Sequence, residues 1–334
     1  MVATTEGAPA PPRRLILDMD VGVDDAVAIV YLAGHPEVSI AAVGSIHGNV
    51  EAPLAAQNAR RVLELCGLDD VPVAVGCWRP LAQPLATAGR VHGLDGLGNT
   101  ARPSPRRGPG GEHAVDQLLR LAHASPGAYD VLATGPLTNL GAALIMDREL
   151  PGLIRSVVIM GGAADGSGNA TVNGEANVWH DPEAAEIVLN AGWPITMVGL
   201  DVTMSTRLEE HELERIAAGG TAHGSFVSAI LQHYLSVYAR SFGGRRICPL
   251  HDPLAAGVLV DSTLVTRALD VPVRVSREGL TRGMTVVDRR SKYAASPDEA
   301  GPLIRVALGV DSRRFIDDLV GVLTRPLPRR TPGA

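Results

Sequence analysis

The chain has 334 residues, of which 46% are hydrophobic and only 3% aromatic, and its formal net charge is -6. This hydrophobic content supports a large buried core, whereas the negative charge and the few aromatic rings argue against a nucleic-acid binder, which needs clustered basic side chains or stacking platforms. No apolar run approaches the roughly 18 residues of a membrane span, and the first twelve residues lack the pattern of a signal peptide, so we expect neither membrane association nor export.

Three cysteines, Cys66, Cys77 and Cys248, are widely spaced and form no CxxC pair. Neither a disulfide framework nor a zinc ribbon is indicated, and a reducing compartment suits such a chain best. We therefore predict a cytoplasmic protein.

The composition of the two ends differs from that of the interior. Residues 1–13 are rich in Ala, Thr and Pro, and residues 325–334 are rich in Pro and Arg. Both ends are predicted to be disordered tails, so that the folded domain spans residues 14–324.

Within the folded part, short β-branched runs alternate with helical patterns. The predicted strands are residues 15–19, 40–44, 71–75, 129–133, 156–160 and 195–200, and the clearest helices are residues 25–34, 51–66, 181–190 and 222–240. This alternation predicts an α/β fold with a Rossmann-like core, in which helices flank an open, mainly parallel sheet in a single domain. Ligands of such sheets bind beyond the carboxyl ends of the strands. The Gly- and Pro-rich stretch 98–111 is predicted to be a surface excursion, and the helix at 222–240 to cover the site.

Four carboxylates follow the first predicted strand. Asp18, Asp20, Asp24 and Asp25 fall within eight residues, at a strand end and a helix start. Carboxylates this close repel one another unless a cation compensates them, and their oxygens are the ligands that a hard divalent cation prefers. The alternative is that Asp24 only caps the helix while the others are solvated.

Two other kinds of site compete for this segment. In haloacid dehalogenase-type phosphatases the strand also ends Asp-x-Asp, with the first Asp as nucleophile, but a Thr or Val is expected where this chain has Gly22. An EF-hand loop counted from Asp18 needs Gly at its sixth position and Glu at its twelfth, where Val23 and Ile29 stand. The EF-hand fails, and the phosphatase stays open as an alternative enzyme.

The motif Asp18-x-Asp20-x-Gly22-x-Asp24-Asp25 resembles the N-terminal signature of the inosine-uridine nucleoside hydrolase family, although Val21 stands where the family usually has Pro. The resemblance extends from Arg14 to about Leu323. Further matching segments are 48–49, 92–93, 133–139, 160–162, 169, 175–177, 181–185, 251–253 and 283–288. The resemblance implies a nucleoside hydrolase-like fold and hydrolysis of the N-glycosidic bond of ribonucleosides to ribose and free base.

The resemblance also implies a ligand set. Ca²⁺ would be held by the carboxylates of Asp20, Asp25 and Asp252 and by the backbone carbonyl of Thr134. Oxygen ligands of this kind suit Ca²⁺. The residues implied to bind the ribose are Asp24, Asn49, Met160, Asn169, Glu175 and Asn177.

Other residues are implied to lie near the base. In the family, the His that matches His251 faces the base and can protonate it, and His92 resembles another position near the base. A His beside a metal-ligating Asp can also be a partner of that Asp or a plain surface residue. Tyr234 and Tyr238, one helical turn apart, could pack against the base or only fill the core. Among the tryptophans, Trp78 alone keeps base contact open, and the sequence does not decide between purine and pyrimidine.

These residues predict a mechanism. Asp20 would deprotonate a Ca²⁺-bound water, and His251 would assist departure of the base. The expected partner is a ribonucleoside, and relatives suggest a homodimer or homotetramer. Two alternatives stay open: a phosphohydrolase with Asp18 as nucleophile, and a non-catalytic calcium-dependent nucleoside-binding protein.

Overall fold

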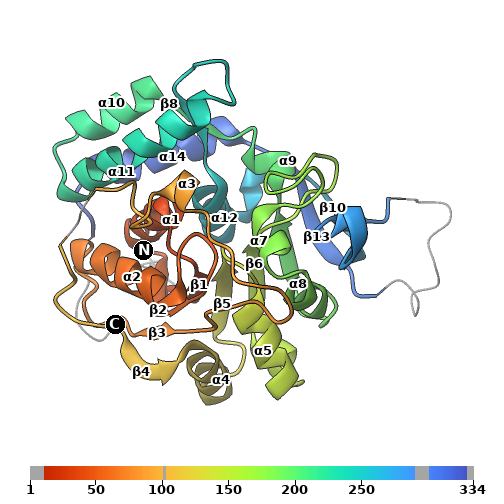
Figure 1. Ribbon diagram of the computed structural model, residues 1–334. Helices are drawn as coiled ribbons and strands as arrows, with labels where there is room; N and C mark the ends of the chain where they lie inside the picture. The colour runs from red at the N-terminus through yellow and green to blue at the C-terminus, as the bar shows by residue number, and fades with distance from the viewer. Residues whose placement is uncertain (1–10, 101–102, 290–300, 329–334) are drawn as a thin grey trace, which may run out of the picture.

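A computed structural model describes residues 11–100, 103–289 and 301–328. In these ranges a nine-stranded open sheet carries helices on both faces (Figure 1). Its strands, in spatial order, are β10 (Val265–Val271), β13 (Ile304–Val310), β7 (Ile195–Val198), β6 (Ser156–Met160), β5 (Tyr129–Ala133), β1 (Arg13–Met19), β2 (Val38–Ser45), β3 (Val73–Val75) and β4 (Gly110–His113). Neighbouring strands are parallel except β10, which runs antiparallel to β13. The predicted fold class is confirmed.

The chain enters the sheet at its middle. From β1 it proceeds through β2 and β3 to β4 at one edge, then returns to β5 on the other side of β1 and continues through β6 to β7. The strand order therefore reverses between β1 and β5, and a crevice opens beyond the carboxyl ends of strands at such a point. Asp20 follows the end of β1 and Thr134 follows the end of β5, so both lie at this crevice.

Two groups of helices cover the two faces of the sheet. One face packs against α1 (Val23–Ala33), α2 (Ala52–Leu65), α11 (Ala222–Ala239), α12 (His251–Val260) and α14 (Ser312–Thr324). The other packs against α4 (Ala114–Ala124), α5 (Thr138–Met146) and α8 (Pro182–Leu189). The remaining elements are α3 (Gly89–His92), α6 (Leu150–Leu153), α7 (Ala176–His180), α9 (Leu200–Thr203), α10 (Glu210–Ala218), β8 (Arg207–Glu209), β9 (Ile247–Pro249), β11 (Val273–Val275), β12 (Thr285–Val287) and two short 3₁₀ helices, Ser262–Leu264 and Gly279–Thr281.

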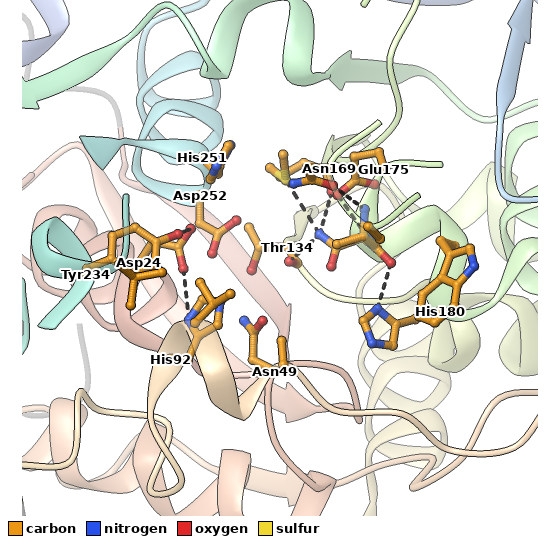
Figure 2. Close-up of a pocket in the computed structure, with 18 of the residues that line it drawn as sticks. Asp24, Asn49, His92, Thr134, Asn169, Glu175, His180, Tyr234, His251 and Asp252 are labelled. Carbon is orange, nitrogen blue, oxygen red and sulfur yellow. Dashed lines mark hydrogen bonds and ion pairs between the residues drawn. The ribbon is translucent and has the colours of Figure 1, made fainter. Parts of the chain in front are cut away.

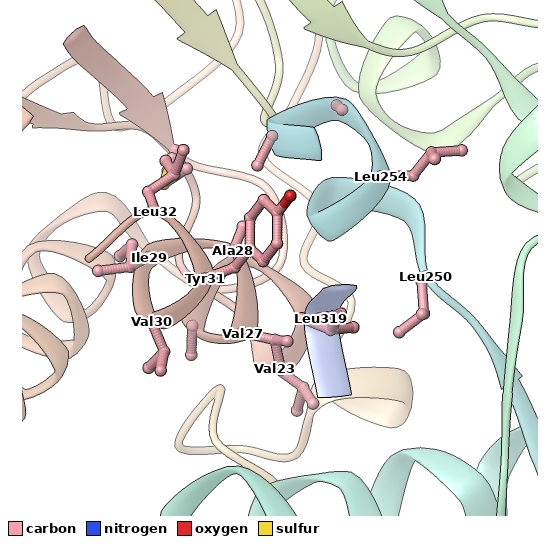
Figure 3. Packing of buried hydrophobic residues seen from close by; sticks show 14 of the residues in the cluster. Val23, Val27, Ala28, Ile29, Val30, Tyr31, Leu32, Leu250, Leu254 and Leu319 are labelled. Carbon is pink, nitrogen blue, oxygen red and sulfur yellow. The ribbon is translucent and has the colours of Figure 1, made fainter. Parts of the chain in front are cut away.

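Helix α1 is buried along its whole length. Its apolar side chains pack beside Leu254 of α12 and Leu319 of α14 (Figure 3). A helix that is apolar on all sides belongs in a core, where each fully buried Val or Ile side chain contributes about 1.5–3 kcal/mol. The packing of α1 therefore carries Asp24 and Asp25, in its first turn, into the interior of the protein.

The observed elements differ from the predicted ones mainly at the sheet edges. The strands predicted at 129–133 and 156–160 have the predicted bounds, and the helix predicted at 222–240 ends at Ala239. Strands β10 and β13 had not been predicted. Strand β4 begins at Gly110, inside the stretch 98–111 that was expected to be a surface excursion. The predicted tails lie mostly outside the described residues, although β1 begins at Arg13, inside the first of them. Among the described helices none has the length and hydropathy of a membrane span.

Candidate active site

A cavity of about 530 Å³ opens at the reversal of the strand order. Its lining includes every residue predicted to bind substrate, namely Asp24, Asn49, His92, Met160, Asn169, Glu175, Asn177 and Tyr234, together with Thr134, His251 and Asp252. Figure 2 shows Asp24, His251 and Asp252 on one side of this space and Asn169 and Glu175 on the other, with Thr134 between them. Asp20 and Asp25 are buried beneath the lining, where they contact Asn49 and Thr134.

Carboxylates from the two ends of the sequence meet at this cavity. One oxygen each of Asp24, Asp25 and Asp252 lie within 4.8 Å of one another, and all three side chains are buried. The fourth carboxylate, Asp20, interacts electrostatically with Asp25 and Asp252. We call Asp20, Asp24, Asp25 and Asp252 the carboxylate cluster. It includes Asp24, which had been predicted to bind the sugar rather than the metal.

Among the described residues, no Lys or Arg side chain forms an ion pair with the carboxylate cluster, and the one histidine close enough for an ion pair is His92, 3.7 Å from Asp24. Burial, reinforced by the neighbouring carboxylates, raises the pKa of Asp20 and of Asp252 well above the ordinary value. Burial and the charge of Asp24 raise the pKa of Asp25 to about 6. Oδ1 of Asp24 is buried and has no hydrogen-bond partner in the described ranges. Oxygen donors that repel one another and include an unpartnered atom fit a hard divalent cation.

Two glycines allow the cluster to form. Nδ2 of Asn49 donates to Oδ1 of Asp20 at 3.0 Å and to Oδ2 of Asp25 at 3.2 Å, and the backbone N–H of Asn49 donates to Oδ2 of Asp20 at 2.6 Å. Gly48 has φ +151°, and a Cβ there would lie 2.0 Å from Oδ2 of Asp20. A Cβ on Gly22 would lie 2.4 Å from Nδ1 of His92. Only glycine therefore permits these close approaches.

Glu175 organises the opposite side of the cavity. As the N-cap of α7, its Oε1 accepts the N–H of Asn177 at 2.9 Å and its Oε2 accepts the N–H of Val178 at 3.0 Å. Oε2 also accepts the N–H of Gly162, directly after β6, at 2.9 Å. One side chain thus joins the start of α7 to the end of a strand.

Asn177 connects two neighbouring strand ends. Its Nδ2 donates to the carbonyl of Thr134 at 2.7 Å and to that of Met160 at 3.0 Å. A carbonyl has two lone pairs, so Thr134 retains one for a further ligand. Oδ1 of Asn169 accepts the N–H of Ala176 at 2.8 Å, at the exposed rim. We call Asn169, Glu175 and Asn177 the polar wall.

His251 lies between two hydroxyl groups. Its Nδ1 is 2.8 Å from Oγ1 of Thr203 and its Nε2 is 3.1 Å from the hydroxyl of Tyr238. Burial lowers the pKa of His251, although the charge of Asp24 opposes this shift. The hydroxyl of Tyr234 donates to Oδ2 of Asp24 at 3.1 Å. Tyr234 and Tyr238 therefore line the cavity and make hydrogen bonds to Asp24 and His251, in addition to packing in the core.

His92 is a neutral imidazole in the lining. Its Nδ1 accepts the N–H of Val23 at 3.2 Å, and burial lowers the pKa of His92 to about 4. The ring therefore carries its proton on Nε2.

The sequence reasoning missed two aromatic side chains. His180 and Trp179 line the cavity, whereas Trp78, the tryptophan kept for base contact, is 69% exposed and lies outside it. His180 stands three residues after Asn177 in α7, a spacing that places two side chains on one face of a helix. That spacing could have identified His180.

Comparisons with known proteins identify the family of the chain. The model of the family described as inosine-uridine preferring nucleoside hydrolase matches residues 15–317. The inosine-uridine preferring nucleoside hydrolase of Leishmania major is 38% identical over 285 residues, covering 84% of this chain and 88% of that protein. A pyrimidine-specific ribonucleoside hydrolase of Shewanella sp. (strain ANA-3) is 38% identical over 312 residues, covering 93% and 96%.

Among solved structures, a plant nucleoside hydrolase is similar with a TM-score of 0.91 and 34% sequence identity, covering 95% of this chain and 100% of that one. Both the sequence match and the shared fold extend over nearly the whole domain. The chain therefore belongs to the inosine-uridine preferring nucleoside hydrolase family, and it is a hydrolase that acts on the N-glycosidic bond of ribonucleosides.

Proposed function

We propose that this chain cleaves ribonucleosides to ribose and free base with a water molecule that Asp20 deprotonates. Ca²⁺ would be held by the carboxylates of Asp20, Asp25 and Asp252 and by the carbonyl of Thr134, and His251 would assist departure of the base. The observation that carries the proposal is the meeting of Asp252, from α12, with Asp24 and Asp25, from α1. Of the predicted metal ligands, Asp252 and Thr134 line the cavity, and Asp20 and Asp25 lie buried beneath that lining.

Asp20 has the surroundings of a general base. Two hydrogen bonds from Asn49 fix both of its oxygens in place, and each oxygen retains a lone pair to accept a proton. When bound, Ca²⁺ supplies the positive charge that keeps the cluster ionised and acidifies a nearby water. Asp20 would accept the proton of that water as it attacks C1' of the ribose, which inverts the anomeric centre.

The other carboxylates and the polar wall would bind and polarise the sugar. Positive charge grows on C1' and the ring oxygen as the bond to the base breaks, so negative side chains near the ribose stabilise the transition state. Asp24 and Glu175 supply that charge from opposite sides of the cavity. Asn49, Asn169 and Asn177 would orient the ribose, because each hydroxyl group is both a donor and an acceptor.

The departing base needs a proton. The side chains of His251 and Tyr238 line the cavity and are joined at 3.1 Å. A neutral imidazole with its hydrogen on Nε2 would donate a hydrogen bond to the base as negative charge grows on it, and solvent would supply the proton once the base has left. His92 and Tyr234 would lie close to the base.

The test is a reducing-sugar assay across inosine, adenosine, guanosine, uridine and cytidine, with and without a calcium chelator. Calcium-dependent release of ribose is expected, and the panel spans the bases because the relatives differ in the substrates that their names state. Phosphate release from p-nitrophenyl phosphate with Mg²⁺, without ribose release, would favour the phosphohydrolase. Binding of nucleosides without turnover would favour a binding protein.

A homodimer or homotetramer and a cytoplasmic location are also part of the proposal. The three cysteines, Cys66, Cys77 and Cys248, are free thiols, which a reducing compartment preserves. Light scattering on the purified protein would give its oligomeric state.

A further inference from the structure

Thr203 contacts the cavity only through His251. It ends the short helix α9, directly behind the imidazole, and its side chain is fully buried. Its Oγ1 lies 2.8 Å from Nδ1 of His251 and has no second hydrogen-bond partner in residues 11–100, 103–289 and 301–328. The position of the hydroxyl hydrogen therefore depends on this one contact.

The chemistry of this contact assigns the proton of the imidazole. If Nδ1 carried the proton, Thr203 would accept it and the buried hydroxyl hydrogen would have no acceptor, at a cost of about 1–3 kcal/mol. If Thr203 donates instead, both groups are satisfied. Nδ1 of the neutral ring is then unprotonated, and its proton lies on Nε2.

The contact on the other side of the ring is compatible with this assignment. The hydroxyl of Tyr238 lies 3.1 Å from Nε2 of His251, and its oxygen can accept a hydrogen from that nitrogen. The ring of Tyr238 also packs edge-on against that of Tyr234, whose hydroxyl donates to the carboxylate of Asp24. The assignment of the proton therefore depends on the contact with Thr203.

We propose that Thr203 is a positioning residue that holds His251 in the tautomer with its proton on Nε2, on the side of the cavity. The inference rests on the proposed role of His251 in assisting departure of the base, through a hydrogen bond from Nε2. The same short helix is fixed to the loop after β6, because Asp201 accepts the N–H groups of Ala164 and Asp165 at 2.8 and 2.7 Å. Helix α9 therefore sets the position of His251 relative to the loop that leads to the polar wall.

The test compares Thr203→Val, which keeps the shape and removes the hydroxyl, with Thr203→Ser, which keeps the hydroxyl. Thr206→Val is the matched control, because Thr206 is equally buried and its Oγ1 contacts Val202 and Ser312 instead of His251. We expect Thr203→Val to lower kcat on the best nucleoside about 10- to 100-fold, part of the full effect of one hydrogen-bond donor to a developing negative charge. KM should stay within about twofold, because ground-state binding is unchanged.

The second substrate is p-nitrophenyl β-D-ribofuranoside, whose nitrophenolate leaves without a proton. Thr203→Val should hydrolyse it at the wild-type rate, and Thr203→Ser should recover most of the activity on the nucleoside. A Thr203→Val enzyme with wild-type kcat on the nucleoside, or with equal losses on both substrates, would overturn the inference. Failure of the proposed function looks different: the wild-type enzyme would cleave no nucleoside, or His251→Gln would cleave it as fast as the wild type.

A direct measurement covers the case in which Thr203→Val does not fold. ¹⁵N spectra of histidine-labelled wild-type protein, with His251→Gln used for assignment, report which ring nitrogen bears hydrogen. We expect a protonated Nε2 and an unprotonated Nδ1 for His251. The reverse pattern would overturn the inference.

Discussion

The two sides of the cavity differ in how far the protein satisfies their polar atoms. In the polar wall, both oxygens of Glu175 accept backbone N–H groups and Nδ2 of Asn177 donates to two carbonyls. In the carboxylate cluster, Oδ1 of Asp24 has no hydrogen-bond partner among the described residues, and burial raises the pKa of Asp25 and Asp252.

This difference separates two ways of building a site. The wall is held in position by the backbone before any ligand arrives, so little conformational entropy remains to be lost on binding. The fold holds the four carboxylates of the cluster close together although they repel one another, and they need a cation to be ionised at the same time. Changes in the two regions should therefore respond differently to calcium.

The largest effect is expected at Asp20, the proposed general base. Asp20→Ala removes the proton acceptor and one carboxylate of the cluster, and we expect ribose release to fall about 10³-fold or more. The measurement is kcat on the best nucleoside at saturating Ca²⁺, with the exposed Asp70→Ala as control. A folded Asp20→Ala protein with the original rate would refute the assignment.

The next effect concerns Asp18, a buried residue of β1 that lies two positions before Asp20. Its Oδ1 accepts from Asn139 at 2.7 Å, and burial raises the pKa of Asp18 to about 7. The pKa of Asp18 is higher in the folded than in the unfolded protein, so protonated Asp18 stabilises the fold. Its contribution to the free energy of unfolding is complete below a pH of about 4 and is lost as the pH rises to about 7. We expect Asp18→Asn to remove this loss, on the order of 4 kcal/mol. Urea unfolding across this range at saturating Ca²⁺ measures it, and parallel pH profiles for the two proteins would contradict it.

Calcium itself should stabilise the folded protein. At a concentration of 100 times Kd, Ca²⁺ should raise the free energy of unfolding by about 2.7 kcal/mol. Asp252→Asn should abolish this increment, yet in chelator it should melt above the wild type because one repelling charge is gone. Calorimetry with chelator and with Ca²⁺ measures both effects. Equal Ca²⁺ increments in the two proteins would show that Asp252 is not a ligand.

The smallest effect is expected in the polar wall. Glu175→Ala removes the N-cap of α7, which we expect to lower the free energy of unfolding by about 1–2 kcal/mol. The loss should be the same in chelator and in Ca²⁺, because Glu175 belongs to the wall and not to the cluster. If Glu175→Ala lowered the free energy of unfolding only in the presence of Ca²⁺, Glu175 would belong with the calcium-dependent cluster, and the two sides of the cavity would not differ as argued.

The sequence revealed the local part of the site better than the distant part. Asp20, Asp24 and Asp25 follow one strand within a few residues, so their proximity could be inferred from their spacing and the need for a cation from their repulsion. The approach of Asp252 came from resemblance, because sheet topology, rather than local periodicity, brings α12 beside α1. For the same reason the contact between Thr203 and His251 had no sequence signal. Strand β10 was missed because its half-buried and exposed residues do not alternate regularly.

The bridge from Asn177 to Thr134 and Met160 has a consequence for how substrate preference can change. The two carbonyls follow adjacent parallel strands, whose separation of about 4.8 Å is a constant of the sheet. If Asn177 binds the ribose as proposed, recognition of the sugar is tied to a spacing that mutation cannot easily alter. Tyr234 and Tyr238 belong to α11 and His92 to α3, outside the sheet. Under the proposed function, substitutions there should exchange one base for another while the position of the sugar is kept.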